Sequence, residues 1–243
     1  MDTEVTSLVK LLILDEVHLL NSDRGPVIEA LVARTLRQVL SSQSIIRIVA
    51  LSATLPGYLD VANFLKVSPY TGLFFFDNRF RSVPLTQTFI GVKNKNDQDA
   101  MDLICYNKLI PIIKEGQQVM VFVTSRNLTA TVAKNLLAHA KNNKHLALFT
   151  PEKKAAIRSS VKSSELELLI PNGFGCHHAG MCRSDRLEVE SLFRQGVLKV
   201  IVCTTTLAWG VNLPAHAVII RVSWSYLGNQ KVIIMNRTLI GLV

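Results

Sequence analysis

The sequence contains few cysteines and few aromatic residues, and it has no long hydrophobic run. Only four of its 243 residues are cysteines, and their spacing does not form a framework of disulfide pairs. Reduced thiols are expected, as in a protein of the nucleus or cytoplasm. The first residues, MDTEVTS, are acidic and polar, which differs from a signal peptide. No apolar run reaches the roughly 18 residues that a membrane helix needs, so we expect no membrane partner.

Acidic residues are less frequent than basic residues. Lys and Arg number 27 against 18 for Asp and Glu, so the formal net charge is +9 and the pI is about 9.6. A basic chain of this kind is compatible with nucleic-acid binding. General surface charge explains the same totals equally well, because the basic residues are spread along the chain in short groups such as Lys153-Lys154. With 49% hydrophobic residues, the chain can bury a core in one large or two ordinary domains.

Apolar runs alternate with helical periodicity in the first part of the chain. The run LVKLLIL at 8–14 ends at Asp15, which is typical of a strand buried on both faces. Apolar residues then recur at helical spacing from 28 to 40, and Pro26 suits the first turn of a helix. A second apolar run at 44–51 precedes a stretch rich in turn residues. The order strand, helix, strand predicts a parallel α/β fold.

A longer alternation follows a polar connector at 74–85. We predict a short helix at about 60–67 and further helices at 97–114, 126–140, 154–170 and 184–195. We predict strands at 86–92, 118–125, 173–177, 198–204 and 217–220, and a polar stretch at 142–152 without regular structure. The later part spans roughly 140 residues and is typical of an open α/β domain.

Two adjacent carboxylates follow the first predicted strand. Ligands of open α/β sheets bind at the carboxyl ends of strands. There, Asp15 could hold Mg²⁺ while Glu16 polarises a water molecule. For these two residues alone, a pair of solvated acids is the better explanation. The combination of DEVH after one apolar run and SAT some 35 residues later, after another, is far more specific.

These spaced motifs resemble those of superfamily 2 helicases, and several of them point to the Ski2-like subgroup. DEVH at 15–18 resembles motif II, and SAT at 52–54 resembles motif III. RFRSVPL at 79–85 resembles the entry to the second RecA-like domain, and VFVTSRN at 121–127 resembles motif IV. GFGCHHAGM at 173–181 resembles the HHAGM element, and TTTLAWGVNLPAHAVII at 204–220 resembles motif V. The run from 15 to 38 is similar to the Brr2-like branch.

The resemblance implies RecA-like parallel sheets in two domains. Residues 1–80 would be the C-terminal part of the first domain, residues 81–222 a nearly complete second domain, and residues 223–243 a divergent tail, from an alternative exon or intron read-through. The implied activity is 3′-to-5′ movement on single-stranded or duplex nucleic acid with ATP and Mg²⁺. Implied partners also include subunits of a multiprotein complex of the cointegrator type.

The resemblance also implies roles for individual residues. Asp15 would coordinate Mg²⁺ that arrives with ATP, and Glu16 would orient the attacking water. His18, Ser52 and Thr54 would link the state of the nucleotide to the nucleic-acid track. In the second domain, the residues near the nucleic-acid backbone would be Arg126, His178, Gly180 and Thr205, and those that face the nucleotide would be Gly210 and Asn212.

The sequence has no visible phosphate-binding loop. None of its twelve glycines is followed by lysine, so no G-x-x-x-x-G-K-[ST] motif occurs. Gln230 and Arg237 do not match the spacing of a motif VI. Because phosphoryl transfer depends on positioning and on neutralised charge, we expect no measurable ATP hydrolysis by the 243-residue polypeptide alone. A non-catalytic binding module and a non-functional truncation product are the alternatives.

The resemblance also predicts that the first half is the less stable half. The strand at 44–51 would lack its family neighbour on one side, and an open apolar strand edge invites aggregation or pairing with another chain.

Cysteines and histidines come close together in the sequence at 176–182. Cys176, His177, His178 and Cys182 have some of the character of zinc ligands, with Cys203 as a stray fifth. No second pair follows at finger spacing, so we expect a turn beside nucleic acid rather than a zinc site. We expect Trp209 to pack within the motif V loop; stacking on a base is the alternative.

Overall fold

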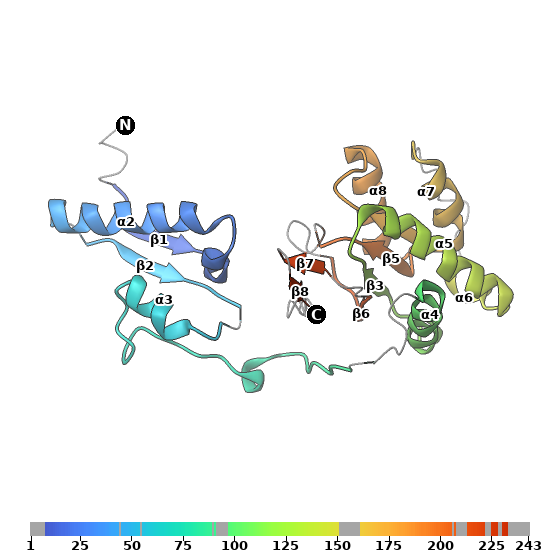
Figure 1. The fold of residues 1–243 in the computed structure, drawn as a ribbon, viewed down its shortest axis with the longest axis horizontal. Coiled ribbons are helices and arrows are strands. Elements are labelled where there is room, and N and C mark those ends of the chain that lie inside the picture. Colours follow the sequence, from blue (N-terminus) through green and yellow to red (C-terminus); the bar gives the residue numbers. More distant parts are fainter. Residues whose placement is uncertain are drawn as a thin grey trace. The chain divides into compact units, whose positions relative to one another are not determined.

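The chain folds into two compact units, Met1–Arg81 and Ser82–Val243, which we call unit 1 and unit 2. A computed structural model (Figure 1) describes residues 8–43, 45–53, 55–88, 90, 97–150, 161–205, 207, 213–221, 225–227 and 230–232. The α/β class that the sequence predicts is confirmed, because parallel strands alternate with helices in both units. Within the described residues, no helix is long and apolar enough to cross a membrane.

Unit 1 is built on a two-stranded parallel sheet. Strands β1 (Leu11–Leu14) and β2 (Arg47–Ala50) pair in register, with Leu11 opposite Arg47 and Leu14 opposite Ala50. The predicted helix between them is α2 (Gly25–Ser42), and Pro26 lies in its first turn as expected. The remaining elements are the 3₁₀ helix η1 (Val17–Asn21), α3 (Tyr58–Phe64) and the 3₁₀ helix η2 (Asn78–Phe80).

Only one face of the sheet in unit 1 is covered by described elements. Leu14, Val32 and Leu65 form a small buried core, and Leu12 packs against it. Leu11 and Ile13 point the other way and remain 50% and 58% exposed. The expectation that this strand is buried on both faces is therefore wrong for the described chain, because α2 packs on one face and no described element of unit 1 packs on the other.

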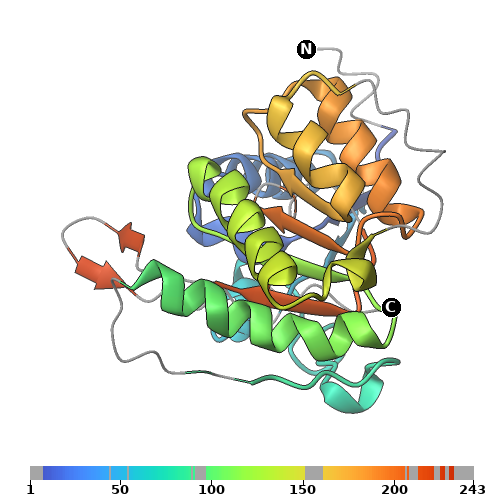
Figure 2. The ribbon, with the colours of Figure 1, turned by 90° about the vertical axis from the view of Figure 1, so that its right-hand side faces the viewer.

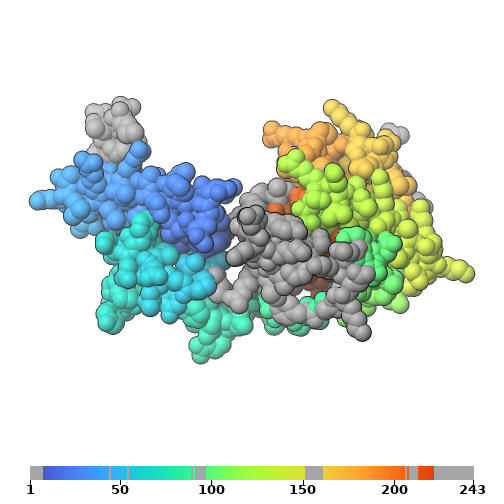
Figure 3. All heavy atoms as spheres, in the orientation of Figure 1, coloured from blue at the N-terminus to red at the C-terminus, as the bar shows by residue number. Residues whose placement is uncertain are grey.

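Aromatic side chains are exposed in the segment that follows α3. The space-filling view (Figure 3) shows this segment in turquoise at the surface of unit 1. Its most exposed rings are those of Tyr70, Phe74, Phe75, Phe76 and Phe80. Apart from η2, the residues from 73 to 88 have no helix or strand. The predicted connector at 74–85 is confirmed, but the strand predicted at 86–92 is absent from residues 86–88 and 90, which pair with no other strand; the other predicted positions lie outside the described residues.

Unit 2 contains a four-stranded parallel sheet with the order β4-β5-β3-β6. Its strands are β3 (Val119–Phe122), β4 (Phe174–His177), β5 (Val200–Cys203) and β6 (Ala217–Ile220). Every residue of β3, β4 and β5 is buried, so both faces of the central sheet are covered, as the continuous apolar runs predicted. Two further strands, β7 (Ser225–Leu227) and β8 (Gln230–Val232), form a separate antiparallel pair.

Helices surround this sheet. They are α4 (Gln98–Lys114), α5 (Arg126–Asn142), α6 (Leu146–Phe149), α7 (Ser164–Leu169) and α8 (Arg183–Arg194), with the 3₁₀ helix η4 (Ile170–Asn172). Figure 2 shows α4 and α5, in green and yellow-green, lying against the sheet; α5 contacts β4 and β5, and α4 contacts β3. Two predictions are corrected. The polar stretch at 142–152 contains α6, and the helix expected at 154–170 begins at Ser164 in the part that is described.

The short helix α6 is held by the packing of the unit 2 core. Phe149 is fully buried, and its ring stacks on that of Phe174 with 4.7 Å between the centroids. Gly173, at φ +79°, lies so close to the Phe149 carbonyl that a Cβ there would collide with it. This long-range contact gives regular structure to a stretch whose composition is polar.

A buried ion pair joins the end of the sheet to two helices. Arg221, directly after β6, places its Nε 2.6 Å from Oδ1 of Asp102 in α4, and the two side chains are 3% and 1% exposed. Arg221 Nη2 also donates to Gln98 Oε1 at 2.8 Å, and Asn135 Nδ2 donates to Asp102 Oδ2 at 2.8 Å. The pair therefore connects β6 to α4 and α5.

The two units differ strongly in their cores, so we expect unit 1 to be digested first by protease. The core cluster of unit 1 contains three buried side chains, whereas unit 2 has a continuous core that runs through its sheet and helices. Limited digestion with thermolysin, followed by mass spectrometry, should leave a resistant fragment within unit 2. Survival of residues 1–80 together with loss of the central sheet of unit 2 would contradict this order.

Candidate functional site

The two acids of unit 1 lie beside the end of the neighbouring strand. Leu51 N donates to Leu14 O at 2.8 Å, and Val17 N donates to Leu51 O at 2.9 Å, so the parallel pairing continues past the ends of both strands. Asp15 follows β1, and Ser52 comes two residues after β2. The structure thus brings motif II and motif III to the same edge of the sheet, where α/β proteins bind ligands.

The backbone at Glu16 separates the two carboxylates. Glu16 is left-handed, with φ 55° and ψ 42°, and its N–H donates to Asp15 Oδ1 at 2.9 Å. For a residue with a side chain, this conformation costs about 1–2 kcal/mol. It turns the chain directly into η1, and both carboxylates are exposed. Two adjacent acids can therefore serve different ligands, because neither side chain is used in the core.

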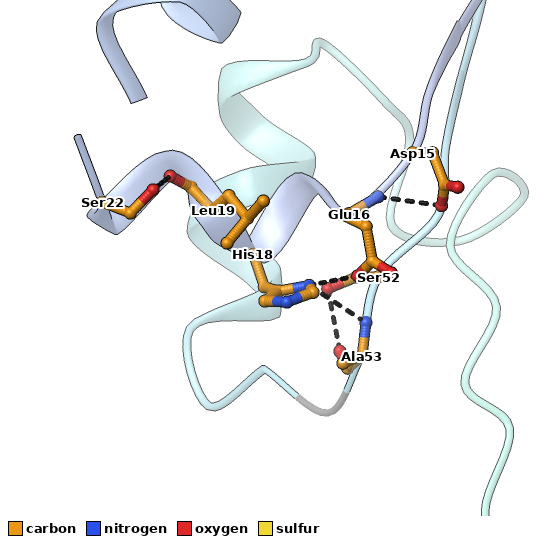
Figure 4. Close-up of polar contacts among 7 residues, drawn as sticks. All are labelled: Asp15, Glu16, His18, Leu19, Ser22, Ser52 and Ala53. Carbon is orange, nitrogen blue, oxygen red and sulfur yellow. Dashed lines mark hydrogen bonds and ion pairs between the residues drawn. The ribbon is translucent and has the colours of Figure 1, made fainter. Parts of the chain in front are cut away.

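His18 joins the two motifs. Its Nδ1 lies 3.3 Å from Ala53 N and 3.3 Å from Glu16 Oε2 (Figure 4). A single ring nitrogen serves only one of these partners at a time. Unprotonated, it accepts the Ala53 N–H; protonated, it donates to the Glu16 carboxylate. His18 Nδ1 therefore lies between the Glu16 carboxylate and the strand end that carries Ser52 and Ala53.

The hydroxyl of Ser52 is directed at its own strand end. Ser52 Oγ donates to Ala53 O at 2.8 Å, and the residue is exposed (Figure 4). The same loop therefore offers the Ala53 N–H to His18 and its carbonyl to Ser52. Thr54, the third motif III residue of the prediction, lies outside the described residues.

Three loops of unit 2 meet at the carboxyl edge of its sheet. Residue Phe122 of β3 is level with Cys203 of β5, which is level with His177 of β4. The segments that follow these residues (124–126, 204–205 and 178–181) therefore share one edge, which we call the loop edge. All four residues that we predicted near nucleic acid belong to it: Arg126, His178, Gly180 and Thr205.

Arg126, His178 and Gly180 lie next to one another at the loop edge. Gly180 N donates to His178 Nδ1 at 3.1 Å. A Cβ added at Gly180 would lie 3.1 Å from His178 Nδ1 and 3.5 Å from Arg126 Cδ, so the lack of a side chain keeps this corner open. Arg126 is the first residue of α5, where the helix dipole adds partial positive charge.

His178 is held mainly in its neutral form. Burial lowers the pKa of its imidazole, and the positive charge of Arg126 lowers it further. This agrees with the role of Nδ1 as the acceptor for Gly180 N. Thr205 is exposed at the end of β5. Gly210, Asn212 and Trp209 lie outside the described residues.

The cysteines and histidines at 176–182 point in different directions. Cys176 is buried in β4, and burial raises the pKa of its thiol to about 12; Cys203 is buried in β5, and its pKa is raised as well. Cys182 is exposed beside Ser184, with 3.2 Å between Sγ and Oγ. His177 turns inward to Glu190, at 2.8 Å. In the part of the chain that the structure describes, no three such side chains gather as metal ligands.

Sequence reasoning missed one pair near the loop edge, Glu190 with His177. The available signal was alternation along β4: because His178 was assigned to the surface, its neighbour His177 had to point into the protein. A buried histidine needs a polar partner. Glu190, in α8, supplies it.

Comparison with protein families identifies the class to which the chain belongs. Residues 101–234, more than half of the chain, match the family described as Helicase conserved C-terminal domain, and residues 1–61 match the family described as DEAD/DEAH box helicase. The chain belongs to the helicase family that carries this C-terminal domain. This confirms the resemblance seen in the motifs.

Its relatives include large proteins from animals, plants and fungi. The chain is 57% identical over 231 residues to activating signal cointegrator 1 complex subunit 3 of Homo sapiens, a match that covers 90% of this chain and 10% of that protein. It is 54% identical over 231 residues to the DExH-box ATP-dependent RNA helicase DExH14 of Arabidopsis thaliana (90% and 11%), and 52% identical over 229 residues to the RQC trigger complex helicase SLH1 of Saccharomyces cerevisiae (90% and 12%). The chain thus spans about a tenth of the length of these relatives.

A solved structure has the same fold. The structure of Mycobacterium smegmatis helicase Lhr bound to ssDNA and AMP-PNP matches 89% of this chain with a TM-score of 0.52 and 22% identity, and the match covers 25% of that protein. This likeness supports the RecA-like α/β architecture.

Proposed function

We propose that this chain supplies two working surfaces of an ATP-dependent nucleic-acid helicase. One is the magnesium and water side of the ATP site, in unit 1. The other is a nucleic-acid contact at the loop edge of unit 2. The observation that supports the proposal best is the convergence of the β1 and β2 ends, which brings Asp15 and Glu16 beside Ser52.

Asp15 and Glu16 have the chemistry that the ATP site needs. Mg²⁺ prefers oxygen ligands and is commonly bound by one or two carboxylates together with substrate phosphates and water, so an exposed Asp15 at a strand end fits it. When bound with ATP, the ion neutralises charge on the phosphates. Glu16, free of partners in the core, would accept a hydrogen bond from the attacking water and orient it. His18 would pass the state of this carboxylate to motif III.

The loop edge has the chemistry that a phosphate backbone needs. The Arg126 guanidinium and the start of α5 supply positive charge, and the open corner at Gly180 leaves room for a chain to approach closely. Thr205 adds an exposed hydroxyl. Such contacts hold the backbone and suit DNA and RNA alike.

The two units would be parts of successive RecA-like domains. We assign residues 1–80 to the C-terminal part of a first domain, 81–222 to a nearly complete second domain, and 223–243 to a divergent tail. Cycles of domain closure on ATP and reopening on hydrolysis would move the protein 3′ to 5′ along one strand. The name of the human relative places that protein in a cointegrator complex, so subunits of such a complex are the protein partners that we propose.

The structure of unit 2 supports a second candidate function for the 243-residue polypeptide, which is the binding of single strands without ATP. Its continuous core contrasts with the core cluster of three buried side chains in unit 1, and the loop edge belongs wholly to unit 2. A module that binds single strands without ATP would need only this half.

Replacing Arg126 with alanine tests the loop edge. We expect single-strand binding by the 243-residue polypeptide to weaken, and the slope of log K against log salt concentration to become shallower by about one, because one phosphate contact is lost. The measurement is fluorescence anisotropy with a labelled 20-nucleotide oligouridylate over a range of salt concentrations.

The matched control is Arg194→Ala. Arg194 is exposed in the last turn of α8, at the opposite edge of the sheet, so it changes the net charge by the same amount away from the loop edge. Equal losses for the two variants would attribute binding to general charge and overturn the assignment.

A further inference from the structure

The buried pair His177–Glu190 stands directly behind the loop edge. His177 is the last residue of β4 and is 3% exposed. Its Nε2 lies 2.8 Å from Glu190 Oε1, and the Glu190 side chain is 12% exposed. Because an ionised carboxylate only accepts, Nε2 carries the proton and donates it. Nδ1 is buried and has no hydrogen-bond partner among the described residues.

The backbone of His177 is tied to another loop of the same edge. Thr204 N donates to His177 O at 3.2 Å, next to the exposed Thr205. Immediately after His177 the chain turns. His178 N donates to Met181 Sδ at 3.4 Å, and Met181 N donates to His178 O at 3.2 Å. One residue thus connects the sheet, helix α8 and two of the three loops.

We propose that His177 and Glu190 are positioning residues that fix the 178–181 turn, and with it His178 and Gly180, for contact with a phosphate backbone. The inference rests on the proposed nucleic-acid contact at the loop edge. Neither side chain touches the ligand. Glu190 holds the His177 ring, the ring fixes the end of β4, and that end sets the direction in which the turn leaves the sheet.

The hydrogen bond between His177 and Glu190 depends on the charge of both side chains. Burial lowers the pKa of His177, and Arg186, one turn before Glu190 on α8, lowers it too, while the Glu190 carboxylate opposes both. The ring therefore stays neutral, with a single donor aimed at one acceptor. Without Glu190, Nε2–H would be a buried donor without a partner, which raises the free energy of the folded state. Rotation of the ring or entry of water beside it would lower that free energy. Either movement would shift His178.

The test compares three variants of the 243-residue polypeptide. Glu190→Ala removes the acceptor, and Glu190→Gln replaces it with an amide oxygen. Glu188→Ala removes the same charge two residues earlier on α8, on a side of the helix that does not face His177. Affinity for the labelled 20-nucleotide oligouridylate is measured below the onset of thermal unfolding of each variant, as fixed by near-ultraviolet circular dichroism.

We expect Glu190→Ala to weaken binding about threefold to tenfold, although it makes the protein more basic. Glu190→Gln should recover most of that loss, and Glu188→Ala should bind as well as the unsubstituted chain or better. In ¹⁵N–¹H spectra, the amide resonances of residues 179–181 should move in Glu190→Ala and return in Glu190→Gln.

Two results would overturn the inference. One is an unchanged affinity of folded Glu190→Ala; the other is an equal loss in Glu188→Ala. A failure of the proposed function looks different. If the unsubstituted chain does not bind the oligonucleotide, the proposed nucleic-acid contact is wrong. The amide resonances of residues 179–181 still decide whether the pair positions the turn.

Discussion

The substitution Glu16→Gln is expected to lower ATP turnover by about 10²- to 10⁴-fold in a chimeric helicase that contains this chain. This is the usual effect of removing a positioned proton acceptor. Gln keeps the size of Glu16 but cannot take a proton from water. Because the 243-residue sequence contains no phosphate-binding loop, the measurement uses a chimera. The aligned part of this chain replaces the matching segment of the Arabidopsis relative DExH14, which is 54% identical, and nucleic-acid-stimulated ATP hydrolysis is followed.

The control for this variant is Glu29→Gln, an exposed carboxylate of α2 in the same unit. It should leave turnover unchanged. Binding of a fluorescent ATP analogue should survive in Glu16→Gln, because Asp15 remains available for Mg²⁺. Turnover by Glu16→Gln within a factor of ten of the unsubstituted chimera would show that Glu16 does not orient the water.

Removing the arginine of the buried ion pair should cause the largest loss of stability. Arg221→Met leaves Asp102 charged and buried, which costs about 3–5 kcal/mol of unfolding free energy. Urea unfolding is followed by far-ultraviolet circular dichroism, to which the long helices α4, α5 and α8 of unit 2 contribute.

Two controls separate this effect from a general loss of charge. Lys134 pairs with Glu165 at 3.0 Å, but the side chains are 43% and 42% exposed, so Lys134→Met should cost no more than about 1 kcal/mol. The double variant Asp102→Asn with Arg221→Met should recover part of the loss, since the buried charge is gone. If Arg221→Met and Lys134→Met cost the same, the buried pair has no special weight.

The sheet of unit 2 could be predicted well because its signal is local. Strands covered on both faces are continuous apolar runs, and β3, β5 and β6 all lie within such predicted runs. The strand expected at 86–92 is absent from residues 86–88 and 90, because these residues pair with no other strand. Helix α6 was missed because Phe149 folds against Phe174, a contact that no local pattern records.

The candidate sites were predictable in outline. Strand ends followed by DEVH and SAT are enough to expect Asp15 near Ser52, and the loops after β3, β4 and β5 are enough to expect the loop edge. The left-handed Glu16 and the two alternative partners of His18 depend on backbone geometry that the letters do not encode. Alternation along β4 indicates that His177 points inward, but it does not indicate that Glu190, thirteen residues later, is its partner.

The most direct test of the account is duplex unwinding by the same chimera without further substitutions. A labelled duplex with a 3′ single-stranded overhang is mixed with ATP and Mg²⁺, and strand separation is compared with that by the parent DExH14. If this chain supplies the water side of the ATP site and the loop edge of a helicase, the chimera separates the strands in an ATP-dependent manner, and Glu16→Gln abolishes the activity. A folded chimera that binds ATP and the overhang, yet separates no strands while the parent does, would contradict the account.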